Sequence, residues 1–303
     1  MIVLSPLVFQ PAATLVITFG GDVFLAREGQ PLFSNNPWGQ FAQPEAIAPG
    51  SPETHWLLIN LESPLGEAPP APGSGYNLCA PQEQVWVLSA GGVHLASTLN
   101  NHAEDCAAGG QTANVLEQAG LVTLSNGYQP LYQQSPAGIV AFIGANAVGE
   151  PLDSSRLLAA CSAAAARSDI VIVSLHWGVE YSAQPSQAQR NLAQALADVG
   201  VDVLWGHHPH VLQPMEWVTS SSGDHQMLAM YSLGNLLSDQ AAVWSTSHSA
   251  LVSLRFDQDG LQGLSLQPVS ARPGDFALVK PSQGDAERIS RRLNWEEVTA
   301  RRP

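Results

Sequence analysis

The fold is decided by Ile170-Val171-Ile172-Val173-Ser174-Leu175-His176-Trp177-Gly178 together with Val201-Asp202-Val203-Leu204-Trp205-Gly206-His207-His208-Pro209-His210. Both runs begin with short β-branched or aliphatic segments that are apolar on both faces, which is typical of buried strands. Residues 186–199 lie between them, carry apolar side chains on one stripe and end at Gly200, which predicts a helix. The order strand, helix, strand predicts a βαβ unit with parallel strands.

Further elements repeat this pattern on both sides of the unit. Apolar runs at 15–19, 56–59, 93–99 and 227–233 predict more strands, and residues 110–119, 154–167 and 285–293 predict helices. Residues 249–269 alternate around a turn and, with 211–233, predict an antiparallel region, whereas the Pro- and Gly-rich residues 64–81 predict a long loop. We therefore expect one α/β domain over residues 12–270 and a C-terminal extension over 271–303 whose surface helix packs on it.

Composition limits the class of protein and its partners. The 303 residues are 45% hydrophobic and 13% charged, so a sizeable core is expected. The formal charge is −14, from 26 acidic and 12 basic residues, which argues against nucleic acid as a partner.

The cysteines and the N-terminus bear on the compartment. Cys79, Cys106 and Cys161 are odd in number and scattered, which predicts buried or incidental thiols in a reducing compartment. Pro6 and Pro11 interrupt the apolar start, no basic segment precedes it, and no run of about 18 apolar residues occurs, so no signal peptide or transmembrane segment is expected. These features predict a cytoplasmic protein without a membrane span.

Polar side chains follow the predicted strands, where open α/β sheets bind their ligands. Imidazole nitrogens with carboxylate and amide oxygens suit a divalent metal ion such as Zn, Mn, Fe or Co, in one or two positions. Such an ion can activate water and polarise a phosphoryl or carbonyl oxygen. The predicted metal ligands are Asp22, Glu62, Asn101, His176, His208 and His210.

The most specific element is His208-Pro209-His210. In an extended segment the two imidazoles would point to the same side, toward one ion or two adjacent ions, and His207 would point away. The alternative is a solvated His-rich turn.

Asn101-His102 is the second specific element. The amide oxygen of Asn101 can ligate a metal, His102 can act as a general acid toward a leaving group, and Asp105 can orient that imidazole. The alternative is that Asn101 caps a helix and His102 lies on the surface.

The other positions carry less information when taken singly. Asp22 follows a Gly-Gly pair that is usually a structural turn, and His176 could be a satisfied core histidine. Glu62 is costly to bury unless it is paired or metal-bound, which favours a site. For Glu180 and Tyr181, substrate contact and packing are equally supported. The residues expected to line or support the site are Asn60, Asn100, Trp177, Glu180, Tyr181, His207 and Asn235.

Six ordered motifs resemble one known family. They are Gly21-Asp22-Val23-Phe24-Leu25, Asn60-Leu61-Glu62, Asn100-Asn101-His102 with Asp105, His176-Trp177-Gly178 with Glu180-Tyr181, Gly206-His207-His208-Pro209-His210-Val211 with Gln213, and Tyr231-Ser232-Leu233-Gly234-Asn235. Over residues 14–240 they resemble the CapA family, which is named for poly-γ-glutamate capsule biosynthesis and is related to the calcineurin-like metallophosphoesterases. The resemblance implies a four-layer α-β-β-α sandwich, with the six ligands named above at metal positions and His102 as proton donor.

Two positions depart from the metallophosphoesterase pattern. A typical member has a His two residues after its first Asp, where this chain has Phe24, and an Asp in its second motif, where this chain has Glu62. One metal position is therefore expected to be weaker or absent.

Three functional hypotheses follow. The first is metal-dependent hydrolysis of a small phosphoester, with His102 protonating the leaving oxygen. The second is cleavage or transfer of a γ-glutamyl amide at the same site. The third is a non-catalytic accessory protein that binds polyglutamate or components of a polyglutamate synthase.

Overall fold

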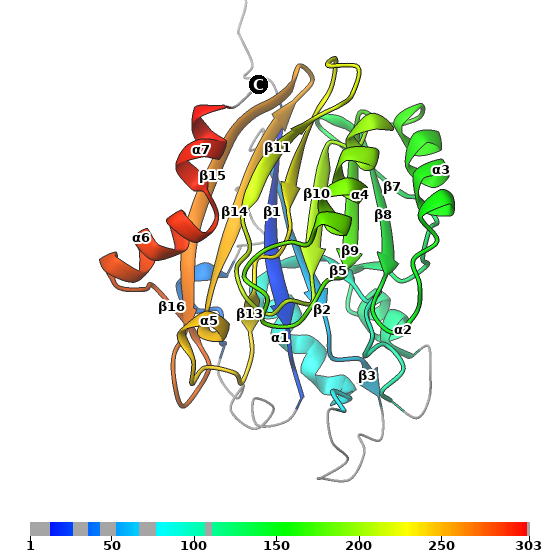
Figure 1. Ribbon diagram of the computed structural model, residues 1–303. Helices are drawn as coiled ribbons and strands as arrows, with labels where there is room; N and C mark the ends of the chain where they lie inside the picture. The colour runs from blue at the N-terminus through cyan, green and yellow to red at the C-terminus, as the bar shows by residue number, and fades with distance from the viewer. Residues whose placement is uncertain (1–12, 27–35, 43–52, 67–76, 107–110, 302–303) are drawn as a thin grey trace, which may run out of the picture.

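The structure is a computed structural model that describes residues 13–26, 36–42, 53–66, 77–106 and 111–301. Two β-sheets lie face to face at its centre, and helices pack on their outer faces (Figure 1). This is a four-layer α-β-β-α sandwich, so the predicted fold class is confirmed.

The larger sheet has the order β16-β15-β14-β1-β2-β5-β6, and β13 also pairs with β1. Neighbouring strands from β1 to β6 run parallel, whereas β14 and β15 form the antiparallel hairpin predicted for residues 249–269. The strands of this sheet are β1 (Thr14–Val23), β2 (Glu53–Leu61), β5 (Val93–Ser97), β6 (Val122–Leu124), β13 (Asn235–Leu237), β14 (His248–Asp257), β15 (Gly260–Ala271) and β16 (Leu278–Val279).

The smaller sheet has the order β11-β12-β10-β9-β8-β7. Its four middle strands are parallel, and β7 and β11 run antiparallel at the edges. The strands are β7 (Leu131–Ser135), β8 (Gly138–Asn146), β9 (Ile170–His176), β10 (Val203–His207), β11 (Met215–Thr219) and β12 (Gln226–Met230). The predicted βαβ unit is therefore present as β9, α4 (Gln187–Asp198) and β10.

The helices divide between the two outer faces. Helices α1 (Val85–Gly91) and α2 (Gln111–Gln118) pack on the larger sheet, and α3 (Ser154–Ala165) and α4 pack side by side on the smaller one (Figure 1). The remaining elements are η2 (Gly39–Phe41), η3 (Gln82–Gln84), α5 (Trp244–Ser247), α6 (Gln283–Arg292), α7 (Trp295–Ala300) and the short parallel pair β3 (Leu65–Gly66) and β4 (Ala80–Pro81). Within the described ranges, no helix has the length and apolar character needed to cross a membrane.

Side-chain caps determine where the two helices on the smaller sheet begin. The Ser186 hydroxyl accepts from the Gln189 N–H while the Gln189 side chain accepts from the Ser186 N–H, which forms a capping box at the start of α4. At the start of α3, the Asp153 side chain accepts from the Arg156 N–H. Each of these helices connects two parallel strands of the smaller sheet, and the carboxyl ends of those strands lie at the same edge.

The C-terminal residues form two helices where the sequence predicts one. Ile289, Leu293 and Val298 are buried in the same core that separates the two sheets. The domain limits at residues 12, 270 and 271 stay predictions, and the middle of the predicted loop at 64–81 lies outside the described residues.

Helix α1 and strands β6, β7 and β8 were missed by the sequence analysis. Strand β8 was not expected, although it pairs with β9 along its length. Gly20-Gly21 is not a turn but part of β1, where the pairing with β2 shifts register between Phe19 and Asp22. A Cβ on Gly21 would lie 1.9 Å from the Gly234 carbonyl oxygen, so only glycine permits this close approach.

His94 gives the stability of this fold a pH dependence that can be measured. Its ring stacks on Trp56 with 4.6 Å between centroids, and burial lowers its pKa from 6.5 to about 4. The unfolded chain binds a proton near pH 6.5 whereas the folded chain does not, so this contribution is complete above that pH and is lost as the pH falls toward 4. We expect the His94→Phe variant, which keeps a stacked ring, to gain up to about 3 kcal/mol relative to the parent protein over this range.

Urea unfolding of both proteins between pH 7 and pH 4 measures the effect. Taking the difference between them cancels the other titrating groups. A difference in unfolding free energy that is independent of pH would contradict the assignment to His94.

Candidate metal centre

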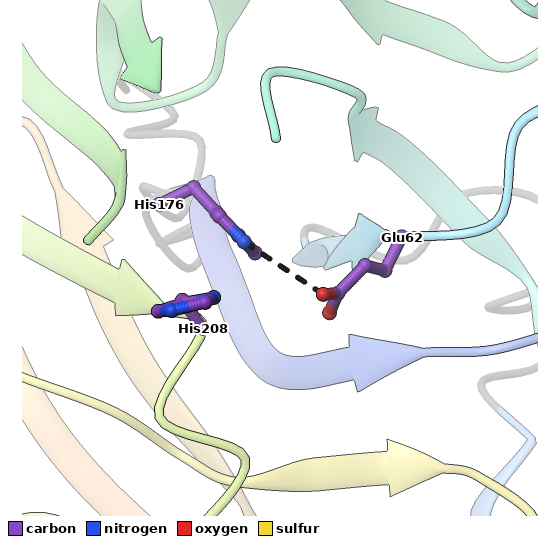
Figure 2. Close-up of side chains that lie close together, drawn as sticks. All are labelled: Glu62, His176 and His208. Carbon is purple, nitrogen blue, oxygen red and sulfur yellow. Dashed lines mark ion pairs between the residues drawn. The ribbon is translucent and has the colours of Figure 1, made fainter. Parts of the chain in front are cut away.

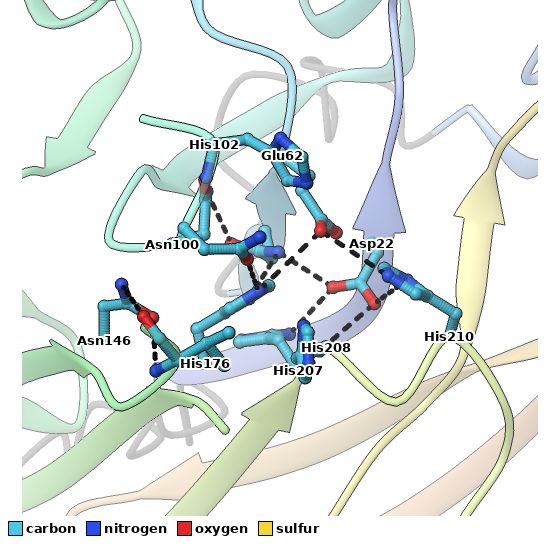
Figure 3. A network of polar contacts seen from close by, with 12 residues as sticks. Asp22, Glu62, Asn100, His102, Asn146, His176, His207, His208 and His210 are labelled. Carbon is cyan, nitrogen blue, oxygen red and sulfur yellow. Dashed lines mark hydrogen bonds and ion pairs between the residues drawn. The ribbon is translucent and has the colours of Figure 1, made fainter. Parts of the chain in front are cut away.

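The carboxyl ends of parallel strands from both sheets meet at one edge, where a network of polar side chains gathers (Figure 3). His176 ends β9 and His207 ends β10, and these two residues are register partners. Asp22 lies near the end of β1 and is paired with Asn60 of β2. The structure therefore brings together strand ends that are far apart in the sequence.

Asp22 and Glu62 bury two carboxylates at this edge, 1% and 0% exposed. The Asn60 side-chain amide donates to Asp22 Oδ1 at 2.8 Å, and His210 Nδ1 lies 3.3 Å from Asp22 Oδ2. Burial of an ionised carboxylate costs several kcal/mol unless it is paired, so these contacts offset part of the cost of burying Asp22.

The charge on Asp22 is stabilised mainly by His210. Burial alone would raise the pKa of Asp22, but the hydrogen bond and charge of His210 hold that pKa well below its usual range. Burial alone would lower the pKa of His210, but the nearby charges of Glu62 and Asp22 raise it to about 9. Asp22 and His210 thus form a buried ion pair when no cation is bound.

Glu62 lies close to the imidazoles of His176 and His208 (Figure 2). Its Oε1 lies 3.7 Å from His176 Nε2 and 3.6 Å from His210 Nε2. His176 Nε2 also lies 2.7 Å from the Asn101 side-chain oxygen, and the His176 and His208 rings are 4.9 Å apart. Two atoms that each lie about 2.1 Å from a shared ion in tetrahedral geometry are about 3.4 Å apart, so the separations from Glu62 are close to those of ligands around one ion.

The donor set fits a divalent cation. Burial lowers the pKa of His176 and of His208, and neutral imidazoles keep the lone pair that ligates a metal. Nδ1 of His208 is buried and has no hydrogen-bond partner in the part of the chain that the structure describes. Three groups have ligand atoms within 4.8 Å of one another: Glu62, His176 and His208; Asp22, Glu62 and His210; Glu180, His208 and His210.

The backbone of the His-Pro-His segment is not extended as predicted, yet the imidazoles of His208 and His210 both reach the centre. His208 has φ 93° and His210 has φ 58°, so both adopt left-handed backbone conformations that residues other than glycine rarely populate. His207 does not point away, because it is 1% exposed and its Nδ1 lies 3.6 Å from Asp22 Oδ1. Burial lowers the pKa of His207 to about 4.

Residues 100–105 place His102 at the rim of this centre. The buried Asn100 amide donates to the Leu61 carbonyl at 2.8 Å, and its oxygen accepts from the His102 N–H at 3.1 Å. His102 Nδ1 lies 2.8 Å from Asp105 Oδ2, which is the orienting contact that the sequence suggested. Residues 101–104 form a turn, so the alternative in which Asn101 caps a helix is not found.

A disulfide between Cys79 and Cys106 fastens the same loop. The carboxylate of Asp105 also accepts from the Leu78 N–H at 2.6 Å, so this segment is tied at two adjacent residues. The prediction of three free thiols is wrong, since only Cys161 is unpaired. Disulfides persist mainly in oxidising compartments, which weighs against the predicted cytoplasmic location.

The remaining predicted residues lie around the centre. Trp177 is buried and donates to the Tyr231 carbonyl, so it packs beneath the site. Asn235 Oδ1 lies 3.1 Å from His210 Nδ1, while its amide donates to Gln240. Sequence analysis did not identify Gln240, because its contact with Asn235 of β13 is visible only in the structure.

The mouth of the centre is formed by the loop that follows β9. Glu180 and Tyr181 are exposed, and the Tyr181 ring lies 6.2 Å from the His210 ring. Tyr181 also lines a surface pocket of about 460 Å³ together with Gln240 and Val243. This pocket offers space beside the metal centre for part of a substrate.

Comparison with known proteins identifies relatives along most of the chain. The sequence profile of the family described as "Bacterial capsule synthesis protein PGA_cap" matches residues 16–240. "PGA biosynthesis protein CapA" of Bacillus subtilis (strain 168) is 36% identical over 144 residues, which are 47% of this chain and only 36% of that protein. "Capsule biosynthesis protein CapA" of Bacillus anthracis is 28% identical over an alignment of 319 residues, 95% of this chain and 75% of that protein.

A solved structure shares the fold at low sequence identity. The crystal structure described as a novel phosphatase from Mycoplasma pneumoniae superposes with a TM-score of 0.54 and 14% identity, over 85% of this chain and 94% of that chain. At this identity the likeness concerns the fold alone.

Loss of the disulfide should destabilise the protein. The bond spans 27 residues, and closing a loop of that length contributes about 3 kcal/mol to the free energy of unfolding. We expect a Cys79→Ser/Cys106→Ser double variant to lose about this amount in chemical denaturation. Dithiothreitol should have the same effect on the parent protein and none on the double variant, whereas equal sensitivity of the two proteins would contradict the pairing.

Loss of the Glu62 carboxylate should weaken metal binding. Glu62 belongs to two of the three ligand groups, so Glu62→Gln should lower the affinity for Mn²⁺ by more than about tenfold. Isothermal titration calorimetry measures this, with Glu117→Gln on the exposed surface of α2 as the matched control. Unchanged Mn²⁺ binding by Glu62→Gln would show that the two ligand groups containing Glu62 do not act as a metal site.

Proposed function

Because the chain belongs to the bacterial capsule synthesis protein family PGA_cap, we propose that it is a metal-dependent hydrolase with a phosphoesterase-type centre. The observation that carries this proposal is the convergence of two buried carboxylates with the imidazoles of three strand-end histidines beside the His102–Asp105 pair.

Two overlapping sets of side chains would hold the cation or cations. Asp22 and His210 share Glu62 with His176 and His208, and the side-chain oxygen of Asn101 adds to the second set. A divalent ion of the Mn, Fe or Zn type supplies Lewis-acid activation of water and polarises a phosphoryl oxygen. The side chains named here include no lysine or arginine, so the negative charge of a phosphoester would be compensated chiefly by the cation and by protonated histidine.

His102 is proposed as the proton donor. Its Nδ1 contacts Asp105, which leaves Nε2 as the nitrogen that exchanges a proton with substrate. In phosphoester hydrolysis a water oxygen bonds to phosphorus and loses a proton to solvent while the bond to the leaving oxygen breaks, and His102 gives its Nε2 proton to that leaving oxygen. Asp105 fixes the orientation of the ring.

The names of the relatives favour a second substrate class. Two of them are called CapA and are linked by name to PGA or capsule biosynthesis. Poly-γ-glutamate carries γ-amide bonds, so the same centre would polarise an amide carbonyl, and His102 would protonate the leaving nitrogen. A third alternative is an accessory role, in which the pocket lined by Tyr181 and Val243 binds the polymer or a synthase component without cleaving it.

Removal of His102 tests the phosphoesterase proposal. We expect His102→Ala to lower kcat/KM for phenyl phosphate by about 10²- to 10⁴-fold, and to lower it much less for p-nitrophenyl phosphate, whose leaving group needs little protonation. Affinity for Mn²⁺ should stay unchanged, because His102 is in none of the ligand groups. His55→Ala, which removes a histidine paired with Glu53 far from the centre, is the matched control.

The outcomes separate the alternatives. Equal losses on both aryl phosphates would assign His102 a structural role. Shortening of poly-γ-glutamate without hydrolysis of either phosphate would favour the amide-cleaving reaction, and polymer binding without either reaction would favour the accessory role.

A further inference from the structure

Glu180 stands out because it is exposed yet reaches the buried centre. It follows β9 in the segment Trp177–Ser182, and a carboxylate oxygen lies within 4.8 Å of ligand nitrogens of both His208 and His210. In the described part of the chain, its side chain has no hydrogen bond or ion pair. Two imidazoles already assigned to the centre therefore lie within reach of its carboxylate.

Backbone contacts hold Glu180 in this place. The Tyr181 N–H donates to the Pro209 carbonyl at 2.8 Å, and the Gln213 side-chain amide donates to the Ser182 carbonyl at 2.8 Å. Tyr181 also has φ 60°, a left-handed conformation that costs energy in a residue other than glycine. The loop is thus fastened to the His-Pro-His segment on the C-terminal side of Glu180.

Phe24 occupies a position beside His210 but offers no metal ligand. Phe24 lies two residues after Asp22, and its ring packs 5.4 Å from the His210 ring. An aromatic hydrocarbon ring offers no lone pair, so Asp22, Glu62 and His210 are left as a three-residue group. Divalent cations such as Mn²⁺ accept carboxylate oxygens readily, and a further carboxylate beside His210 would complete a fourth position.

We propose that Glu180 is an additional metal ligand that closes the centre from the solvent side and compensates for Phe24. This inference rests on the proposed metal-dependent function. It assigns the exposed loop after β9 a direct part in holding the cation next to His210, where the sequence left substrate contact and packing equally supported.

Calorimetric titration with Mn²⁺ tests the proposal without depending on activity. We expect Glu180→Gln to lower the affinity or the number of Mn²⁺ ions bound, with a loss of about tenfold or more at one position. Glu150→Gln is the matched control, because Glu150 is an exposed acid that follows the neighbouring strand β8 and belongs to none of the ligand groups. The control should change Mn²⁺ affinity by less than about twofold, the effect expected of a distant surface charge.

A second variant separates ligation from a general charge effect. Phe24→His in the Glu180→Gln background places a nitrogen ligand beside His210 and should restore Mn²⁺ binding, with folding checked by thermal unfolding. Wild-type Mn²⁺ binding by Glu180→Gln would overturn the inference and leave the proposed function standing. Absence of Mn²⁺, Fe²⁺ and Zn²⁺ binding by the parent protein would overturn both.

Discussion

The burial of two carboxylates at the meeting edge of two sheets is the constraint on which the rest of the site depends. Asp22 and Glu62 are almost inaccessible to water, and each would cost several kcal/mol to bury alone. Asn60 and His210 offset part of this cost for Asp22, whereas Glu62 faces His176 and His210 at distances longer than a hydrogen bond. A cation among these atoms would interact favourably with both carboxylates, so the electrostatics of the core and the proposed chemistry have the same origin.

The layered fold supplies the alignment that this burial requires. Trp205 of the smaller sheet donates its indole N–H to the Gly20 carbonyl of the larger sheet at 2.8 Å, and its ring packs edge-on against Phe19. Gly21 lets β1 approach residue 234 closely, which sets Asp22 beside the segment that carries His208. Packing between the sheets therefore determines the distance between carboxylates and imidazoles, and the helices mainly stabilise the sheets from outside.

Sequence analysis located the ends of the ligand-bearing strands better than it located the remaining strands and the contacts between loops. Family membership and the four-layer fold are confirmed, because apolar runs followed by Asp, Glu or His reveal where buried strands end. Strand β8 was missed because no Asp, Glu or His directly follows its apolar run at residues 139–145, even though Pro136 and Gly138 mark a turn before it. The Cys79–Cys106 pairing could not be deduced, because it depends on two loops approaching each other in space. The individual metal and catalytic roles stay proposals.

Contacts within the fold hold the strained backbone of the site in place. Tyr181, His208 and His210 all have positive φ angles, and such conformations cost of order 1 kcal/mol or more each outside glycine. They persist because surrounding contacts hold the backbone, including Tyr181 N–H to Pro209, and His208 N–H to Asp22 at 3.4 Å. Packing of the two sheets during folding therefore offsets the conformational energy of these positive φ angles. A bound cation would have to displace the proton that Asp22 and Glu62 stabilise on His210, so the proposed metal affinity would be linked to folding through the same carboxylates.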